Sequence, residues 1–176
     1  MTQWNDTDVP LAYLITVRTY GTWLHGDERG SVDRFMNKYG TPRIPRRNAR
    51  REYNQSIMTG SPVYLNAARR KAVENAIREV CQRRGWMLLA INVRTNHFHV
   101  VVVTPGLKPE RALNAFKAYA TRNMREKGYL TTEHSPWVDK GSERWLWNET
   151  SVANACDYVI NGQGCDLSDF DNWSNG

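Results

Sequence analysis

The chain has 176 residues, of which 40% are hydrophobic and 24% charged, as is typical of one soluble globular domain with its own core. It contains no apolar run of about 18 residues, and its first residues lack the pattern of a secretory signal, so neither a membrane span nor export is expected. Its three cysteines include no CxxC pair, which argues against a disulfide framework or structural zinc and favours a cytoplasmic location.

The charge balance is basic and uneven. The formal net charge is +6, and residues 43–51, RIPRRNARR, carry arginines and no acid. In a chain with seven Trp and eight Tyr, such a cluster is typical of contact with nucleic acid, although a solvated surface loop fits it equally well. The residues predicted to contact DNA here are Arg46, Arg47, Arg50 and Arg51.

The first half of the chain predicts a strand, a long insertion and a helix. Residues 11–20, LAYLITVRTY, are rich in β-branched and aromatic residues and predict a strand. Residues 21–64 show no period, so we expect a basic loop or insertion within a single domain spanning 1–176. A helix then begins after Asn66 as N-cap and ends at Gly85.

The second half predicts a hairpin, a helix, a strand and a closing helix. Residues 86–93 and 97–103 are strands joined by a short link, so they should pair antiparallel. A helix follows from about Glu110 to Glu126, then a strand around 144–147 with one of its two tryptophans in the core. The last helix begins at about Ser151. The order β–α–β–β–α–β predicts an α+β fold, a ferredoxin-like split β-α-β sandwich with an antiparallel sheet.

Two histidines stand two residues apart in the second hairpin strand. Because side chains alternate between the faces of a strand, His97 and His99 should project together, with Phe98 on the reverse face. Two imidazoles on one face form half of a metal site. Taken alone, the pair is more typical of structural histidines.

The closing helix offers polar partners for these imidazoles. Its apolar positions, at i, i+3, i+4 and i+7 from Val152, predict one buried stripe. Tyr158 lies on the flank of that stripe, and Asn161 and Gln163 follow it. Their amide oxygens could ligate Mg²⁺ or Mn²⁺. Helix geometry favours Asn161, one turn from Tyr158.

These features together resemble a known family. The His97-Phe98-His99 triplet, the basic helix after it, RWLWNETSV and DYVINGQG are similar to the single-tyrosine HUH transposases, and within them to the REP-associated tyrosine transposases of IS200-like type. The resemblance covers about residues 11–20 and 66–164. The ordered set of motifs is far more specific than the short triplet alone.

The resemblance implies an activity and a set of site residues. It implies a homodimer that cleaves and rejoins single-stranded DNA at hairpin-type sites through a 5′-phosphotyrosine, with Tyr158 as nucleophile and Mg²⁺ or Mn²⁺ held by His97 and His99. The family's third ligand follows the tyrosine by four residues, where this chain has Gly162. The family usually has Gln or Asn at that position, and the Gln of this motif favours Gln163. Helix geometry favours Asn161, so both residues stay open as the third ligand.

Alternatives remain at the level of the sequence. Tyr119 is the rival nucleophile, and its helix also carries Lys117, Arg122 and Arg125, which could neutralise DNA phosphates. A different function is a non-catalytic module of ferredoxin-like fold that binds single-stranded nucleic acid on its sheet. The absence of a GxxxxGK[ST] loop fits a strand transfer that conserves the phosphoester bond and needs no nucleotide.

Overall fold

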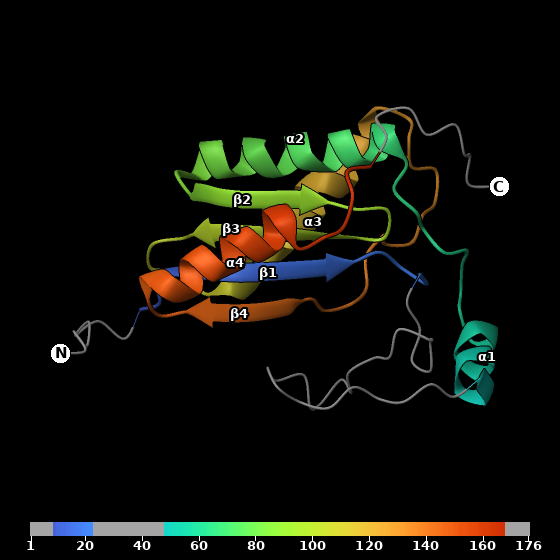
Figure 1. Cartoon of the computed structure of the whole chain (residues 1–176). Coiled ribbons are helices and arrows are strands. Elements are labelled where there is room, and N and C mark those ends of the chain that lie inside the picture. The colour runs from blue at the N-terminus through green and yellow to red at the C-terminus, as the bar shows by residue number, and fades with distance from the viewer. Residues whose placement is uncertain (1–8, 23–47, 168–176) are drawn as a thin grey trace.

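The computed structural model describes residues 9–22 and 48–167, without the side chains of residues 48, 50 and 51. Eight elements follow one another in this part of the chain (Figure 1): β1 (Ala12–Arg18), α1 (Asn48–Ser56), α2 (Ala67–Arg84), β2 (Met87–Val93), β3 (His97–Val103), α3 (Pro109–Glu126), β4 (Ser142–Leu146) and α4 (Glu149–Asn161).

The strands form one antiparallel sheet in the order β2-β3-β1-β4. With α2 between β1 and β2, and α3 between β3 and β4, this is the split β-α-β arrangement, so the predicted ferredoxin-like fold is confirmed. Helices α2 and α3 cover one face of the sheet, and α4 crosses the other (Figure 1). Strand β3, which carries both histidines, is central.

A separate hydrophobic cluster covers each face of the sheet. The larger lies between the sheet and the α2/α3 layer and includes Ile15, Phe98 and Phe116. The smaller lies beneath α4, where Ala155 and Val159 pack against Leu14 and Val101. Successive side chains of β1 and β3 point to opposite faces of the sheet, so each of these strands contributes residues to both clusters.

Local sequence explains where the main helices begin and end. Asn66 caps α2 by accepting a hydrogen bond from the Arg69 amide at 3.0 Å, and Gly85 ends it in the left-handed conformation at φ 65°, which costs glycine no Cβ clash. Both ends were predicted. Pro109 opens α3 at a position where its missing amide proton is not needed.

Two features differ from the sequence prediction. Helix α1 lies within the segment expected to be a loop. Tyr53 and its described neighbours are mostly exposed, so the sequence has no apolar stripe that would predict this helix. Trp145 and Trp147 are both exposed, at 42% and 50%, so the expected core tryptophan is wrong. Leu146 between them is the buried residue, and it belongs to the hydrophobic cluster that includes Ala155 and Val159 of α4.

In the part of the chain that the structure describes, no helix is long and apolar enough to cross a bilayer.

Candidate active site

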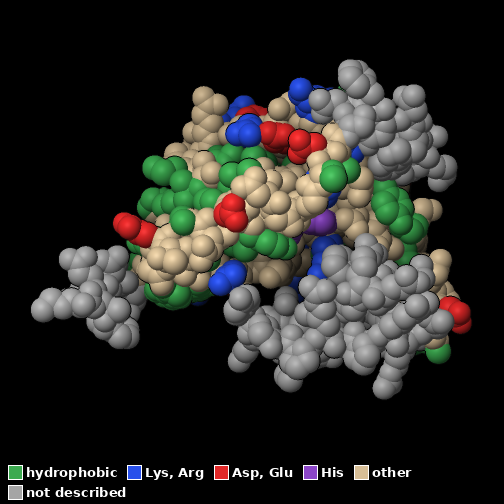
Figure 2. Space-filling model, viewed as in Figure 1, with side chains coloured by type: hydrophobic (Ala, Val, Ile, Leu, Met, Phe, Trp, Pro, Cys, Tyr) green, Lys and Arg blue, Asp and Glu red, His purple; other side chains and the backbone are tan. Residues whose placement is uncertain are grey.

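The two histidines project from β3 onto the sheet face that α4 crosses. Their ring centroids lie 4.7 Å apart, with the planes at 72°. Phe98 between them points to the opposite face and is fully buried, where its ring meets Trp137 edge-on at 5.3 Å. The predicted alternation is therefore confirmed. Histidine side chains are visible beyond the end of α4, beside Lys or Arg side chains (Figure 2).

Each imidazole is oriented through its Nδ1 atom. Nδ1 of His97 lies 2.7 Å from Oδ1 of Asn96, and in the neutral tautomer whose Nδ1 donates to that oxygen, Nε2 carries a lone pair. Nδ1 of His99 lies 2.7 Å from the Thr16 hydroxyl, which can accept that proton in the same way. Such partners orient metal-binding histidines and set their tautomer.

His99 is held in its neutral form. It is only 5% exposed, and burial, together with the electrostatic influence of the neighbouring His97, Arg18 and Arg94, lowers the pKa of His99 to about 3, although a hydrogen bond with Gln163 acts in the opposite direction. A neutral imidazole is the form that binds a metal ion.

Helix α4 brings Tyr158 and Gln163 to this pair. The Tyr158 ring, 47% exposed, lies with its centroid 5.3 Å from that of His99 at 67°. Oε1 of Gln163 lies 3.4 Å from Nε2 of His97, and its Nε2 donates to the Tyr158 carbonyl at 3.1 Å. Asn161 instead donates to Oδ1 of Asp157 at 2.8 Å, along its own helix. Of the two amides left open by the sequence, Gln163 is the one in contact with the histidines.

This donor set fits a divalent cation. Nε2 of His97 and Oε1 of Gln163 lie 3.4 Å apart, and in the His97 tautomer whose Nδ1 donates to Asn96 both atoms present lone pairs. Two ligands that each lie about 2.1 Å from one ion are roughly 3.0–3.4 Å apart. Among the described residues, no group of three His, Cys, Asp or Glu side chains could hold a metal ion. The side-chain oxygen of Gln163, beside His97, is therefore the candidate for a third metal ligand.

Two supporting residues escaped the sequence analysis. The strand pattern includes Thr16 but does not reveal its contact with His99, because that contact depends on the β1–β3 register, which pairs these two residues. Asn96 was read as a link residue. Its carbonyl accepts from the amide and hydroxyl of Thr19, at 2.9 Å and 3.1 Å, so the turn that holds His97 is itself fixed. A polar residue directly before the first histidine was the available signal.

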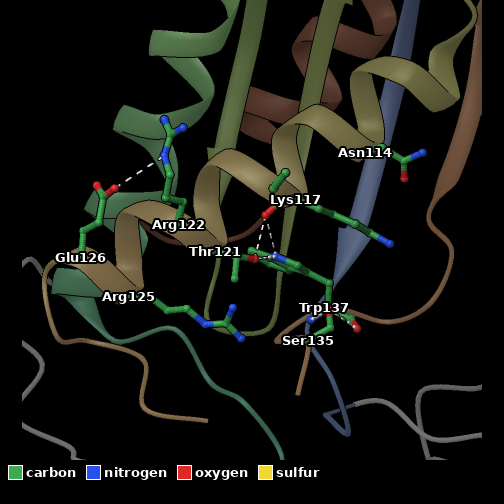
Figure 3. Close-up of a pocket in the computed structure, with 9 residues that line it drawn as sticks. Asn114, Lys117, Thr121, Arg122, Arg125, Glu126, Ser135 and Trp137 are labelled. Atoms are coloured by element: carbon green, nitrogen blue, oxygen red, sulfur yellow. Dashed lines mark hydrogen bonds and ion pairs between the residues drawn. The ribbon is translucent and has the colours of Figure 1, made fainter. Parts of the chain in front are cut away.

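The predicted cations of α3 lie on the other side of the sheet. Lys117, Arg122 and Arg125 line a hollow of about 530 Å³ on the outer side of this helix (Figure 3). Lys117 donates to the Val138 carbonyl at 2.6 Å, Arg125 to the Glu133 carbonyl at 3.1 Å, and Arg122 pairs with Glu126 at 3.7 Å. Each cation thus has a partner within the chain, and their contact with DNA stays a prediction.

The rival nucleophile is on the same helix. Tyr119 packs against the α2/α3 core and lies under the Arg122 guanidinium at 4.5 Å. Since the histidines project from the opposite face of the sheet, the structure separates Tyr119 from them. Of the four arginines predicted to contact DNA in the insertion, Arg46 and Arg47 lie outside the described residues, and only the backbone of Arg50 and Arg51 is described, in α1.

Comparison with known proteins gives the family. The model of the family described as IS200-like transposase matches residues 61–157, more than half of the chain. The chain belongs to the IS200-like transposase family. The match includes both histidines and ends one residue before Tyr158. This transposase family is the one that the sequence motifs predicted. No curated protein matches the chain.

Two solved structures are similar to this transposase. One is a REP-associated tyrosine transposase bound to a REP hairpin, with 14% identity, a TM-score of 0.47, and coverage of 90% of this chain and 70% of that one. The other, from Deinococcus radiodurans R1 and provisionally described as a transposase, has 15% identity, a TM-score of 0.46, and coverage of 94% and 100%.

Proposed function

We propose that this transposase cleaves and rejoins single-stranded DNA at hairpin-type sites, with Tyr158 as the nucleophile and His97, His99 and Gln163 as ligands of Mg²⁺ or Mn²⁺. The observation that carries the proposal is that Tyr158 of α4 and Gln163 just after α4 both lie against the two histidines of β3. The Tyr158 ring of α4 contacts His99 of β3 at 5.3 Å between centroids, and Gln163, just after α4, reaches His97 at 3.4 Å.

The chemistry follows from the residues. The Tyr158 oxygen attacks the scissile phosphorus, a bond forms between them, and the bond from phosphorus to the 3′ oxygen breaks. The phenolic proton passes to solvent, and the departing 3′ oxygen takes a proton to become a hydroxyl. Rejoining reverses the exchange, because a 3′ hydroxyl attacks the phosphotyrosine and the phenol leaves. One phosphoester bond replaces another, so no nucleotide is consumed.

The chain's own residues prepare this exchange. A bound divalent ion would supply charge neutralisation at the phosphate. His99 is kept neutral by its surroundings, and Thr16 and Asn96 keep the two rings turned toward Gln163. Tyr158 is half exposed, which leaves room for a strand of DNA to reach its hydroxyl.

The decisive experiment is covalent capture. The protein is incubated with Mn²⁺ and hairpin-bearing oligonucleotides labelled at the 3′ end, because a 5′-phosphotyrosine retains the 3′ fragment. We expect a labelled adduct that survives denaturation and disappears with chelator, with His97→Ala and with Tyr158→Phe. Tyr119→Phe is the matched control and should keep it. An adduct that persists in Tyr158→Phe, or that Tyr119→Phe alone removes, assigns the nucleophile elsewhere.

The same experiment tests the binding-only alternative. Oligonucleotides that bind tightly but give no adduct across a pool of hairpin sequences would favour a non-catalytic single-stranded nucleic-acid-binding module. The size of the captured protein species, measured by light scattering with and without DNA, tests the homodimer that the resemblance implies.

The basic insertion is proposed to bind the DNA backbone. For a single strand, the slope of log K against log salt becomes shallower by about 0.7 for each phosphate that the protein no longer neutralises. The variant neutralises four arginines together, namely Arg46, Arg47, Arg50 and Arg51. We expect it to show a shallower slope, and an unchanged slope would mean that these arginines do not contact phosphates.

A further inference from the structure

The last turn of α4 is held by side chains of another element. Helix α4 ends at Gly162 with φ −86°, without the left-handed cap that closes α2. The final carbonyls of a helix have no partner within it and must find one elsewhere. The Val159 carbonyl accepts a hydrogen bond from Nδ2 of Asn92 at 2.9 Å. A strand side chain thus substitutes for the missing cap.

A second hydrogen bond follows directly after the helix. Nη1 of Arg94 donates to the Cys165 carbonyl at 3.0 Å. The Arg94 charge therefore lies near the C-terminal end of α4, where the helix dipole is negative. Asn92 and Arg94 come from one edge of the sheet, and Asn92 is the register partner of His99. The two hydrogen bonds bracket Gln163 in sequence and lie next to the histidine strand.

Hydrophobic packing alone leaves this turn loosely held. Val159 is fully buried, but Tyr158 and Ile160 on either side are 47% and 58% exposed. A helix end with little buried apolar surface frays unless hydrogen bonds hold it. Within the turn, the Gly162 amide and the Gln163 side chain both donate to the Tyr158 carbonyl. The two hydrogen bonds from β2 and its end are the ones that tie this turn to the strand beside the histidines.

We propose that Asn92 and Arg94 are positioning residues that hold the Tyr158-bearing turn of α4 on the histidines of the same chain. This inference rests on the proposed function, since it gives these residues a role in aligning the nucleophile. In this role both side chains act through the turn that they hold, by the hydrogen bonds to the Val159 and Cys165 carbonyls. Misalignment of a nucleophile slows the chemical step while the ground-state complex is kept, so the rate of adduct formation should fall and DNA affinity should not.

The first test measures the turn itself. Asn92→Leu removes the donor at nearly constant size and charge, and Arg94→Met removes the guanidinium. Amide hydrogen exchange across residues 158–165 should rise about tenfold in each, the factor expected when a hydrogen bond of about 1.4 kcal/mol is removed. Asn114→Leu and Arg83→Met are matched controls on the exposed faces of α3 and α2, and exchange in 158–165 should not change in them.

The second test measures the reaction. At saturating DNA the rate of adduct formation should fall about tenfold in Asn92→Leu, whereas the dissociation constant for DNA should stay within about twofold. Arg94→Lys, which keeps a donor and the charge, should recover part of the rate that Arg94→Met removes. A decrease in DNA affinity with an unchanged rate would make these side chains binding residues and overturn the proposal.

The third test asks whether one chain supplies the whole site. Tyr158→Phe and His97→Ala proteins are mixed, and the mixture should form no adduct. An active mixture would show that the tyrosine serves the partner's histidines, which overturns the same-chain claim but keeps Tyr158 as the nucleophile. If the unaltered protein forms no adduct, the proposed function fails. The exchange measurement then still decides the role of Asn92 and Arg94, and unchanged exchange overturns it.

Discussion

Replacing Thr16 by valine tests how the His99 tautomer that the proposed metal site requires is set. The Thr16 hydroxyl lies 2.7 Å from Nδ1 of His99, and valine keeps the shape of threonine without the hydroxyl. Because His99 is only 5% exposed, water cannot easily replace the missing hydroxyl. The Nδ1 atom is then left without the hydrogen bond from which the ring takes its orientation.

The magnitude follows from two independent considerations. A buried polar atom deprived of its partner costs about 1–3 kcal/mol. Removal of a residue that orients a metal ligand typically weakens metal affinity about 10–100-fold, which corresponds to about 1.4–2.8 kcal/mol. The two ranges overlap, so we expect Thr16→Val to bind Mn²⁺ about 10–100-fold more weakly than the unaltered chain.

Titration calorimetry with Mn²⁺, together with urea denaturation of the metal-free protein, separates orientation from stability. Thr16→Ser keeps a hydroxyl and should recover most of the affinity. Thr104→Val is the matched control, since Thr104 is buried at the other end of β3 and its hydroxyl donates to the Leu107 carbonyl. It should lower stability and leave Mn²⁺ affinity unchanged. Equal Mn²⁺ affinity in Thr16→Val and the unaltered chain would refute the reasoning.

Three further outcomes are expected. Gln163→Ala should weaken Mn²⁺ binding at least about tenfold and Asn161→Ala should not; calorimetry giving the reverse order would make Asn161 the ligand. Phe98→Ala should lower the free energy of unfolding by about 3–5 kcal/mol in urea denaturation, because the ring is fully buried, and a decrease below about 1 kcal/mol would contradict this packing. Burial raises the pKa of the Cys81 thiol to about 11, so alkylation of the native chain at about pH 8 should spare Cys81 and label the exposed Cys165. Mass spectrometry measures the label at each cysteine, and equal labelling of Cys81 and Cys165 would contradict the burial of Cys81.

The main elements could be predicted because their signals are local. Asn66 and Gly85 bound α2 as expected. Of the predicted apolar stripe of α4, Ala155 and Val159 are buried, and Val152 and Cys156 are partly buried against the same cluster. Helix α1 could not be found in this way, because its described side chains are exposed or half-buried and therefore contribute no hydrophobic period to the sequence. The tryptophans of the β4 region were misassigned because period alone does not say which face of an edge strand is covered.

For this protein, the sequence by itself determined the described elements other than α1, the shared face of His97 and His99, and the face of α4 on which Tyr158 lies, since these depend only on strand and helix periods. Which amide meets the imidazoles was decided by the tertiary structure alone. Spacing along a helix favoured Asn161, but Gln163 lies beyond the helix end, where the chain turns back toward β3. The same holds for Thr16 and Asn92. Their roles come from strand register and helix docking, which bring together residues that no local pattern connects.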